Sequence, residues 1–166
     1  MNSSGKNAAI IGIGLLGSSL GMALRNSGYR RSGWTRRASV TAWALEHDVI
    51  DRGYATLEEA FSDADLLILC VPIPQIMEYI RLHSHRMKPG AILTDIGSVK
   101  TVIEEAALQA HTRYVGGHPM AGTEKTGPEN GFPTLYANAD VFIVPPRNAE
   151  ESDIAEVEKL WRAIGT

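Results

Sequence analysis

The sequence has 166 residues and is 44% hydrophobic, so it is long enough to bury a core, and its length fits one domain, residues 1–166. Its net charge of −3 lacks the basic excess of proteins that neutralise nucleic-acid phosphates. The single cysteine, Cys70, suits a reducing compartment. The polar N-terminus has no signal-peptide pattern, and no apolar run approaches the roughly 20 residues of a membrane helix. We therefore expect a cytoplasmic protein that binds neither nucleic acid nor a membrane.

Short apolar runs alternate along the chain with longer segments of helical character. The runs of strand length are Ala8 to Gly12, Ser32 to Thr35, Leu66 to Val71, Ala91 to Thr94, Tyr114 to Gly116 and Val141 to Val144. The helical segments are Leu15 to Asn26, Ala38 to His47, Leu57 to Phe61, Ile73 to His85, Val99 to His111 and Glu151 to Ile164. This order predicts an α/β fold with a doubly wound, mostly parallel sheet. Gly117 to Ala139 is the one long irregular connection, a kind of segment that is often functional.

A glycine-rich turn joins the first predicted strand to the first predicted helix. Its sequence is Gly12-Ile13-Gly14-Leu15-Leu16-Gly17, a G-x-G-x-x-G pattern in the strand-to-helix context that gives the pattern meaning. In a Rossmann-type domain the first glycine permits the tight turn, the second lets the backbone approach a pyrophosphate, and the third lets the helix pack on the strand. Backbone N–H groups near Leu15 and Leu16 would meet the phosphate charge. The alternative is a turn of the same shape that binds no ligand.

The end of the second predicted strand indicates which dinucleotide binds. NAD-binding domains place a carboxylate there to accept hydrogen bonds from the ribose. Here the sequence is Thr35-Arg36-Arg37, whose hydroxyl and guanidinium groups suit a 2′-phosphate. We therefore expect NADP in preference to NAD. The alternative is that both arginines form a solvated charge pair on a loop.

The fourth strand end, Cys70-Val71-Pro72, lies at the carboxyl edge of the predicted sheet, where ligands of such folds bind. We expect Val71 and Pro72 to line the dinucleotide, which is compatible with a helix that simply starts at a proline. Cys70 is expected to be a small core residue rather than a nucleophile. No residue pattern indicates a metal site: His83 and His85 are two positions apart in a predicted helix and face different directions.

Two further strand ends face the same predicted crevice. One is Asp95-Ile96-Gly97-Ser98-Val99-Lys100, and the other is Gly117-His118-Pro119-Met120-Ala121-Gly122-Thr123-Glu124-Lys125. With these two segments the sequence resembles the prephenate and arogenate dehydrogenases of tyrosine biosynthesis, from about Ala8 to the last residue. This pair of segments is far more specific than the glycine turn.

The resemblance implies an oxidative decarboxylation in which hydride passes to the nicotinamide. It implies that His118 binds the ring hydroxyl of prephenate or arogenate and takes its proton, with Ser98 beside it. An imidazole, whose free pKa is about 6.5, suits that task near neutrality. The resemblance also implies that Lys100, Thr123, Glu124 and Lys125 contact the substrate or shape its entrance.

Members of that family continue into a helical domain that forms a homodimer and supplies further substrate ligands, and we expect this chain to be the part that precedes it. Two other interpretations stay open. One is a dinucleotide-binding module, serving as a sensor or an interaction domain, without catalysis of its own. His118, Ser98 and Lys100 argue against it, because such a module needs no proton acceptor at the nicotinamide end. The other is a dehydrogenase of the β-hydroxyacid type, against which the His118-Pro119-Met120 segment argues.

Overall fold

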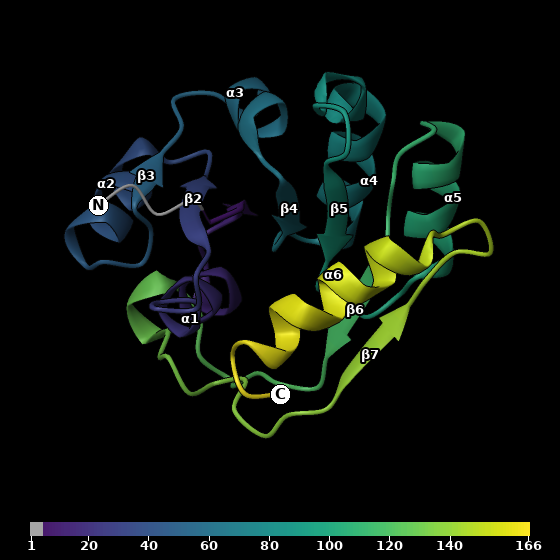
Figure 1. The fold of residues 1–166 in the computed structure, drawn as a ribbon. Helices are drawn as coiled ribbons and strands as arrows, with labels where there is room; N and C mark the ends of the chain where they lie inside the picture. Colours follow the sequence, from purple (N-terminus) through teal and green to yellow (C-terminus); the bar gives the residue numbers. More distant parts are fainter. Residues whose placement is uncertain (1–4) are drawn as a thin grey trace.

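The computed structural model describes residues 5–166, so Met1 to Ser4 of the polar N-terminus lie outside it. The central strands are β1 (Asn7–Ile11), β2 (Arg30–Trp34), β3 (Arg52–Gly53), β4 (Leu66–Leu69) and β5 (Ile92–Asp95). They form a parallel sheet in the order β3-β2-β1-β4-β5 (Figure 1). The chain crosses from β1 to β2 on one side and later returns to place β4 on the other. The crevice of a doubly wound sheet opens at this reversal, outside the carboxyl ends of β1 and β4.

Helices cover both faces of this sheet, as the alternating pattern predicts. The α-helices are α1 (Leu15–Ala23), α2 (Ala38–Glu46), α3 (Leu57–Asp63), α4 (Ile73–His83), α5 (Thr101–Gln109) and α6 (Glu151–Arg162). Buried side chains of α1, α2 and α6 share one core with β1 and β4, and those of α3, α4 and α5 share the other. Figure 1 shows α6, in yellow, crossing the sheet at its β5 side. The doubly wound α/β fold is therefore confirmed.

The innermost strands have the composition that two covered faces demand. All five residues of β1 and all four of β4 are buried. Successive side chains of a strand point to opposite faces, so Ile10 and Ile68 enter one core, and Ile11 and Leu69 enter the other. The unbroken apolar runs of these strands therefore correctly indicated a central position in a parallel sheet.

Of the last two predicted strands, Val141 to Val144 is confirmed, and Tyr114 to Gly116 differs from the structure. Tyr114 and Val115 continue the sheet beside β5 through a parallel bridge to Leu93. β6 (Gly116–Pro119) then pairs antiparallel with β7 (Val141–Val144). His118 was expected after the end of a strand, but it lies within β6, opposite Phe142. The sequence Gly-Gly-His-Pro has no strand pattern of its own, and pairing with a segment more than 20 residues away makes it a strand.

The other differences concern short elements and helix ends. The two-residue strand β3 was not predicted, and β2 begins at Arg30 rather than Ser32. α5 begins at Thr101, and two 3-10 helices, Ser84–Arg86 and Pro128–Asn130, interrupt segments expected to be helical or irregular. Within residues 5–166, no helix combines the length and the apolar character needed to cross a membrane.

Candidate functional site

The glycine turn lies between β1 and α1, against the end of β4. Gly12 has a φ of 97°, and a Cβ added there would lie 2.6 Å from the carbonyl oxygen of Cys70. Only glycine fits this backbone region and this contact without strain. The Gly12 N–H donates to the carbonyl oxygen of Trp34 at 2.8 Å. The turn is therefore fixed to the ends of both strands that flank β1.

The other two glycines of the turn differ in their surroundings. A Cβ at Gly17 would lie 2.0 Å from the carbonyl oxygen of Gly12, so this glycine lets α1 pack on the turn. At Gly14, the residue before the first turn of α1, a Cβ would meet no atom within 4 Å. The fold does not need a glycine there. The open space over the positive end of α1 fits an approaching phosphate group, and this suits the predicted pyrophosphate of a dinucleotide.

Two cavities of about 580 Å³ each meet at this turn. They share Gly14, Cys70, Val71 and Pro72, so they form one crevice along the carboxyl edge of the sheet. The first cavity is lined by Gly14, Leu15, Leu16, Cys70, Val71, Pro72, Ile73, Ile96, Gly97, Ser98, Gly122, Thr123, Lys125, Thr126 and Gly127. The second is lined by Gly12, Ile13, Gly14, Trp34, Thr35, Arg36, Arg37, Cys70, Val71, Pro72 and Tyr79.

The charged side chains that line this crevice are all positive. Arg36 and Arg37 line the second cavity, and Lys125 lines the first. No aspartate or glutamate is among the described residues that line either one. The side chains of Arg36 and Arg37 are exposed and form no ion pair with the residues that the structure describes. The crevice therefore suits an elongated anionic ligand.

Trp34 and Tyr79 form an aromatic wall of the second cavity that the sequence did not indicate. Their rings meet edge to face with centroids 6.1 Å apart. Tyr79 comes from α4, and the pKa of its phenol is raised by burial. Trp34 both packs against the core and lines the cavity. Cys70 lies at the junction of the two cavities, where burial raises the pKa of its thiol, so it stays protonated at neutral pH and is a poor nucleophile.

The connection after β6 encloses the first cavity because it is anchored to α1. The Ser18 hydroxyl donates to the carbonyl oxygen of Pro128 at 3.0 Å, and the Phe132 N–H donates to the Ser19 hydroxyl at 3.1 Å. The Tyr136 hydroxyl donates to the carbonyl oxygen of Leu16 at 2.9 Å. Both serines are fully buried. The segment expected to be irregular is thus held on the helix that begins at the glycine turn.

A buried carboxylate joins the two strand ends that carry Ser98 and His118. Asp95 has no exposed surface, and its Oδ2 accepts from the Gly97 N–H at 2.8 Å and from Lys100 Nζ at 2.5 Å. Lys100 Nζ also donates to the carbonyl oxygen of Gly117 at 2.7 Å. Burial lowers the pKa of Lys100, although Asp95 opposes this shift. Asp95 was not singled out from the sequence, although it begins the Asp95-to-Lys100 segment.

Most of the predicted site residues line the crevice, and four do not. Gly17 packs α1 on the turn, and Lys100 is bound to protein groups. His118 is half-buried in β6 with its ring 6.4 Å from that of Phe142, and Glu124 is exposed on the loop. Within residues 5–166, no hydrogen bond joins Ser98 to His118. Their roles in a substrate complex remain predictions.

Comparison with known proteins identifies the family. The family model described as "Prephenate dehydrogenase, nucleotide-binding domain" matches residues 20–166. The chain belongs to this family. A cyclohexadienyl dehydrogenase from Zymomonas mobilis is 31% identical over 169 residues, which cover 96% of this chain and 56% of that protein. A prephenate dehydrogenase from Lactococcus lactis is 33% identical over 141 residues, which cover 81% of this chain and 39% of the relative.

Solved structures of this family have the same fold. A prephenate dehydrogenase from Aquifex aeolicus, in complex with hydroxyphenyl propionate and NAD+, superposes with a TM-score of 0.88 at 29% identity. The match covers 99% of this chain and 59% of that one. An arogenate dehydrogenase from Synechocystis gives a TM-score of 0.86 at 30% identity, covering 96% of this chain and 57% of that one. The chain therefore spans a little over half the length of these family members.

More distant structures share the fold alone. A 3-hydroxyisobutyrate dehydrogenase from Mycobacterium tuberculosis superposes with a TM-score of 0.72 at only 16% identity. The match to the prephenate dehydrogenase family model favours the tyrosine-pathway interpretation over the β-hydroxyacid one.

Proposed function

We propose that the crevice binds a nicotinamide dinucleotide and that the whole protein catalyses the oxidative decarboxylation of prephenate or arogenate. The main support is that the charged side chains lining the crevice are all positive and that open space lies at Gly14, where α1 begins. The family match and the Aquifex relative in complex with NAD+ support a dinucleotide as the anionic ligand.

The proposed cofactor is NADP in preference to NAD. The second cavity is lined by Thr35, Arg36 and Arg37 and by no carboxylate among the described residues, so a bound ribose would find two cationic donors and a hydroxyl in place of a carboxylate acceptor. Guanidinium groups pair with phosphate oxygens through charge-assisted hydrogen bonds. A free 2′-hydroxyl, in contrast, would lose the acceptor that NAD-binding domains supply.

The reaction then needs one proton acceptor and good alignment. When bound, the nicotinamide supplies a hydride acceptor. His118 would hold the substrate ring hydroxyl and take its proton as the carbonyl forms, with Ser98 beside it. Loss of the ring carboxylate as CO2 then makes the ring aromatic and moves an electron pair onto the ring oxygen, which takes the proton back from His118, so no strong nucleophile is required. Thr123 and Lys125 line the first cavity and Glu124 lies between them, which supports a role in admitting the substrate.

A binding experiment tests the cofactor assignment. We expect NADPH to bind more tightly than NADH when either is titrated into the protein and nicotinamide fluorescence is followed. Arg36→Ala/Arg37→Ala should weaken NADPH binding at least about tenfold, because hydrogen bonds to charged groups contribute about 1.5–3 kcal/mol each, and should leave NADH binding nearly unchanged. Arg147→Ala/Arg162→Ala is the matched control, since it removes the same charge from exposed sites outside the crevice.

Equal binding of both nucleotides by the parent protein would overturn the NADP preference and leave the dinucleotide assignment in place. If neither nucleotide bound at millimolar concentration, the cofactor assignment for this chain would be withdrawn. Turnover assays with prephenate and with arogenate separate the enzyme from a binding module without catalysis. A homodimer and a cytoplasmic location remain predictions, and sedimentation of the protein tests the former.

A further inference from the structure

The Asp95 carboxylate accepts three hydrogen bonds at the carboxyl end of β5. It accepts from the Gly97 N–H and from Lys100 Nζ, and its other oxygen accepts from the Tyr114 hydroxyl at 2.8 Å. Lys100 Nζ carries the network to β6 by donating to the carbonyl oxygen of Gly117. Gly97 precedes Ser98 and Gly117 precedes His118. The two bonds therefore hold the backbone next to each of these residues.

Two consecutive glycines let β6 come close to this network. A Cβ at Gly116 would lie 2.7 Å from the Tyr114 hydroxyl and 2.9 Å from Cδ of Lys100. A Cβ at Gly117 would lie 2.9 Å from the carbonyl oxygen of Asp95. The Lys100 side chain thus passes directly over the β6 backbone. Its side chain is only 12% exposed, so the ammonium is largely withdrawn from solvent.

This burial argues against Lys100 as a free substrate ligand. Its ammonium has a carboxylate and a carbonyl as partners, and Lys100 is not among the described residues that line the crevice. Only the third N–H of this ammonium is left for a substrate carboxylate, and a substrate that displaced the bond to Asp95 would leave an unpaired buried charge.

We propose that Lys100 is a positioning residue that, through Asp95 and the Gly117 carbonyl, holds His118 in register with Ser98. The inference rests on the proposed function, in which His118 accepts the substrate proton. A proton acceptor is effective only within hydrogen-bond reach of its proton, and a displacement of about 1 Å can lower the rate about 100-fold. A bond to the backbone next to His118 can therefore govern turnover without touching the substrate.

The test compares Lys100→Met with a matched lysine at the opposite end of the sheet. Lys88 Nζ also binds one carboxylate, Asp65 at 2.7 Å, and one carbonyl, that of Asp63 at 2.9 Å. We expect Lys100→Met to lower kcat about 10- to 100-fold with KM and nucleotide affinity unchanged, because alignment rather than binding is lost. Lys88→Met should leave kcat unchanged. Lys100→Arg, which keeps the charge and the donors, should recover part of the lost rate.

A second readout does not depend on the reaction. The ring signals of His118 in NMR spectra, identified by their loss in His118→Asn, should shift in Lys100→Met more than in Lys88→Met. If Lys100→Met alone fails to fold, Asp95→Asn/Lys100→Met removes the ion pair without leaving a lone buried charge. The amide oxygen of the asparagine at position 95 can still accept the hydrogen bond from the Gly97 N–H. The same loss of kcat and the same shift are expected in this double variant.

Two results would overturn the inference. One is a raised KM with unchanged kcat in Lys100→Met, which would make Lys100 a substrate ligand. The other is an unmoved His118 signal with unchanged kcat in the double variant. Absence of turnover of both substrates by the whole protein would instead refute the proposed function, and the NMR comparison would still decide whether Lys100 holds His118.

Discussion

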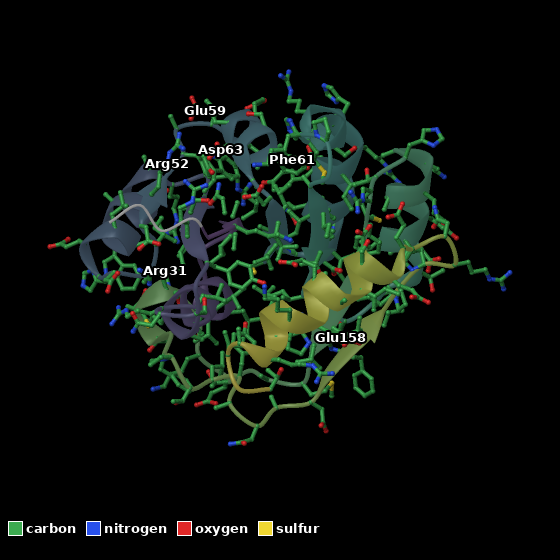
Figure 2. All side chains as sticks on the ribbon, in the orientation of Figure 1. Arg31, Arg52, Glu59, Phe61, Asp63 and Glu158 are labelled. Atoms are coloured by element: carbon green, nitrogen blue, oxygen red, sulfur yellow. The ribbon has the colours of Figure 1, made fainter. Side chains whose placement is uncertain are left out.

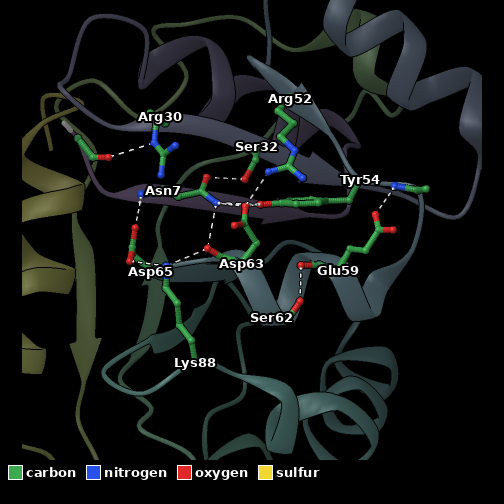
Figure 3. A network of polar contacts seen from close by, with 12 residues as sticks. Asn7, Arg30, Ser32, Arg52, Tyr54, Glu59, Ser62, Asp63, Asp65 and Lys88 are labelled. Carbon is green, nitrogen blue, oxygen red and sulfur yellow. Dashed lines mark hydrogen bonds and ion pairs between the residues drawn. The ribbon is translucent and has the colours of Figure 1, made fainter. Parts of the chain in front are cut away.

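Both ends of the central sheet are polar, but their polar groups have different partners. At the amino end of β1, the amide of Asn7 donates to the Tyr54 hydroxyl at 2.8 Å and to Asp63 at 3.0 Å, and accepts from Ser32 at 2.7 Å (Figure 3). The Asn7 backbone N–H donates to Asp65 at 2.7 Å. Each polar group of Asn7 named here is satisfied inside the protein.

Arg31 extends this pattern on the neighbouring strand. Its guanidinium is buried and binds Asp48 at 2.7 Å, Asp51 at 2.5 Å and the carbonyl oxygen of Gly21 at 3.3 Å. Figure 2 labels Arg31, Arg52 and Asp63 in the part of the molecule that contains β2 and β3. Arg31 holds the pKa of Asp51 below its usual value, although burial opposes this effect. The charge of Arg31 is therefore paired within the protein and is not available to a ligand.

The carboxyl end of the sheet has the opposite character. Several polar side chains there form no hydrogen bond or ion pair with other residues in 5–166: Thr35, Arg36, Arg37, Ser98 and His118. The Asp95–Lys100 pair is the exception, and it supports the strand ends between which a substrate would bind. At the amino end of this sheet the buried polar groups of Asn7 and Arg31 are paired and hold the fold, whereas at the carboxyl end the unpaired Thr35, Arg36, Arg37 and Ser98 line the crevice in which a ligand is expected.

The largest effect is expected from a substitution at the carboxyl end of the sheet. His118→Asn should lower kcat about 10²- to 10⁴-fold, the range typical of a lost general base, since an amide cannot take the substrate proton. Nucleotide affinity and the free energy of unfolding should stay close to those of the parent, because His118 has no hydrogen-bond partner among the described residues. Steady-state assays with prephenate and arogenate measure the effect.

His111→Asn is the control for this substitution. His111 is exposed at the end of α5 with a φ of 51°, a backbone region that asparagine tolerates well. We expect it to turn over substrate at the parent rate. Unchanged kcat in His118→Asn would remove His118 from the proposed chemistry, whereas a loss of rate in both variants would show that the assay responds to something other than the loss of His118.

The sequence predicted the parts of this fold that depend on local pattern. The runs of β1 and β4, the alternation of strands and helices, and the position of Gly12 at a tight turn are all confirmed. A two-residue strand such as β3 has no pattern to recognise. β6 was placed too early because its pairing with β7 depends on a segment far along the chain.

The sequence predicted those site residues that directly follow the ends of strands. Thr35, Arg36, Val71 and Ser98 line the crevice because parallel strands end at one edge of the sheet. Tyr79 escaped prediction because it reaches the crevice from the second turn of α4, and only the packed helix shows this. The partners of Lys100 were equally hidden, since a motif gives the position of a lysine and not the direction in which its side chain folds.

A smaller effect is expected from a substitution at the amino end of the sheet. Asn7→Ala should lower the free energy of unfolding by about 2 kcal/mol, because it removes the partner of the Ser32 hydroxyl and one partner of Tyr54, both in buried surroundings. Urea unfolding followed by circular dichroism measures it. The affinity for NADPH should not change, since the substituted side chain lies at the far end of β1. A weakened NADPH affinity in a variant that is still folded would contradict the separation of the two ends.

The smallest expected effect tests the glycine turn itself. Gly14→Ala adds a methyl group where no atom lies within 4 Å, at a φ of −97° that alanine adopts. The cost in stability should be less than about 1 kcal/mol, the loss expected when alanine replaces a better residue before a helix. The methyl group would instead occupy space over the helix end, where a pyrophosphate must approach the backbone closely. We therefore expect NADPH and NADH to bind about tenfold more weakly, a free-energy change of about 1.4 kcal/mol.

Fluorescence titration and urea unfolding of the same preparation measure the nucleotide affinity and the stability of Gly14→Ala. Unchanged binding of both nucleotides would mean that the phosphates do not approach Gly14, and the open space there would no longer support a dinucleotide site.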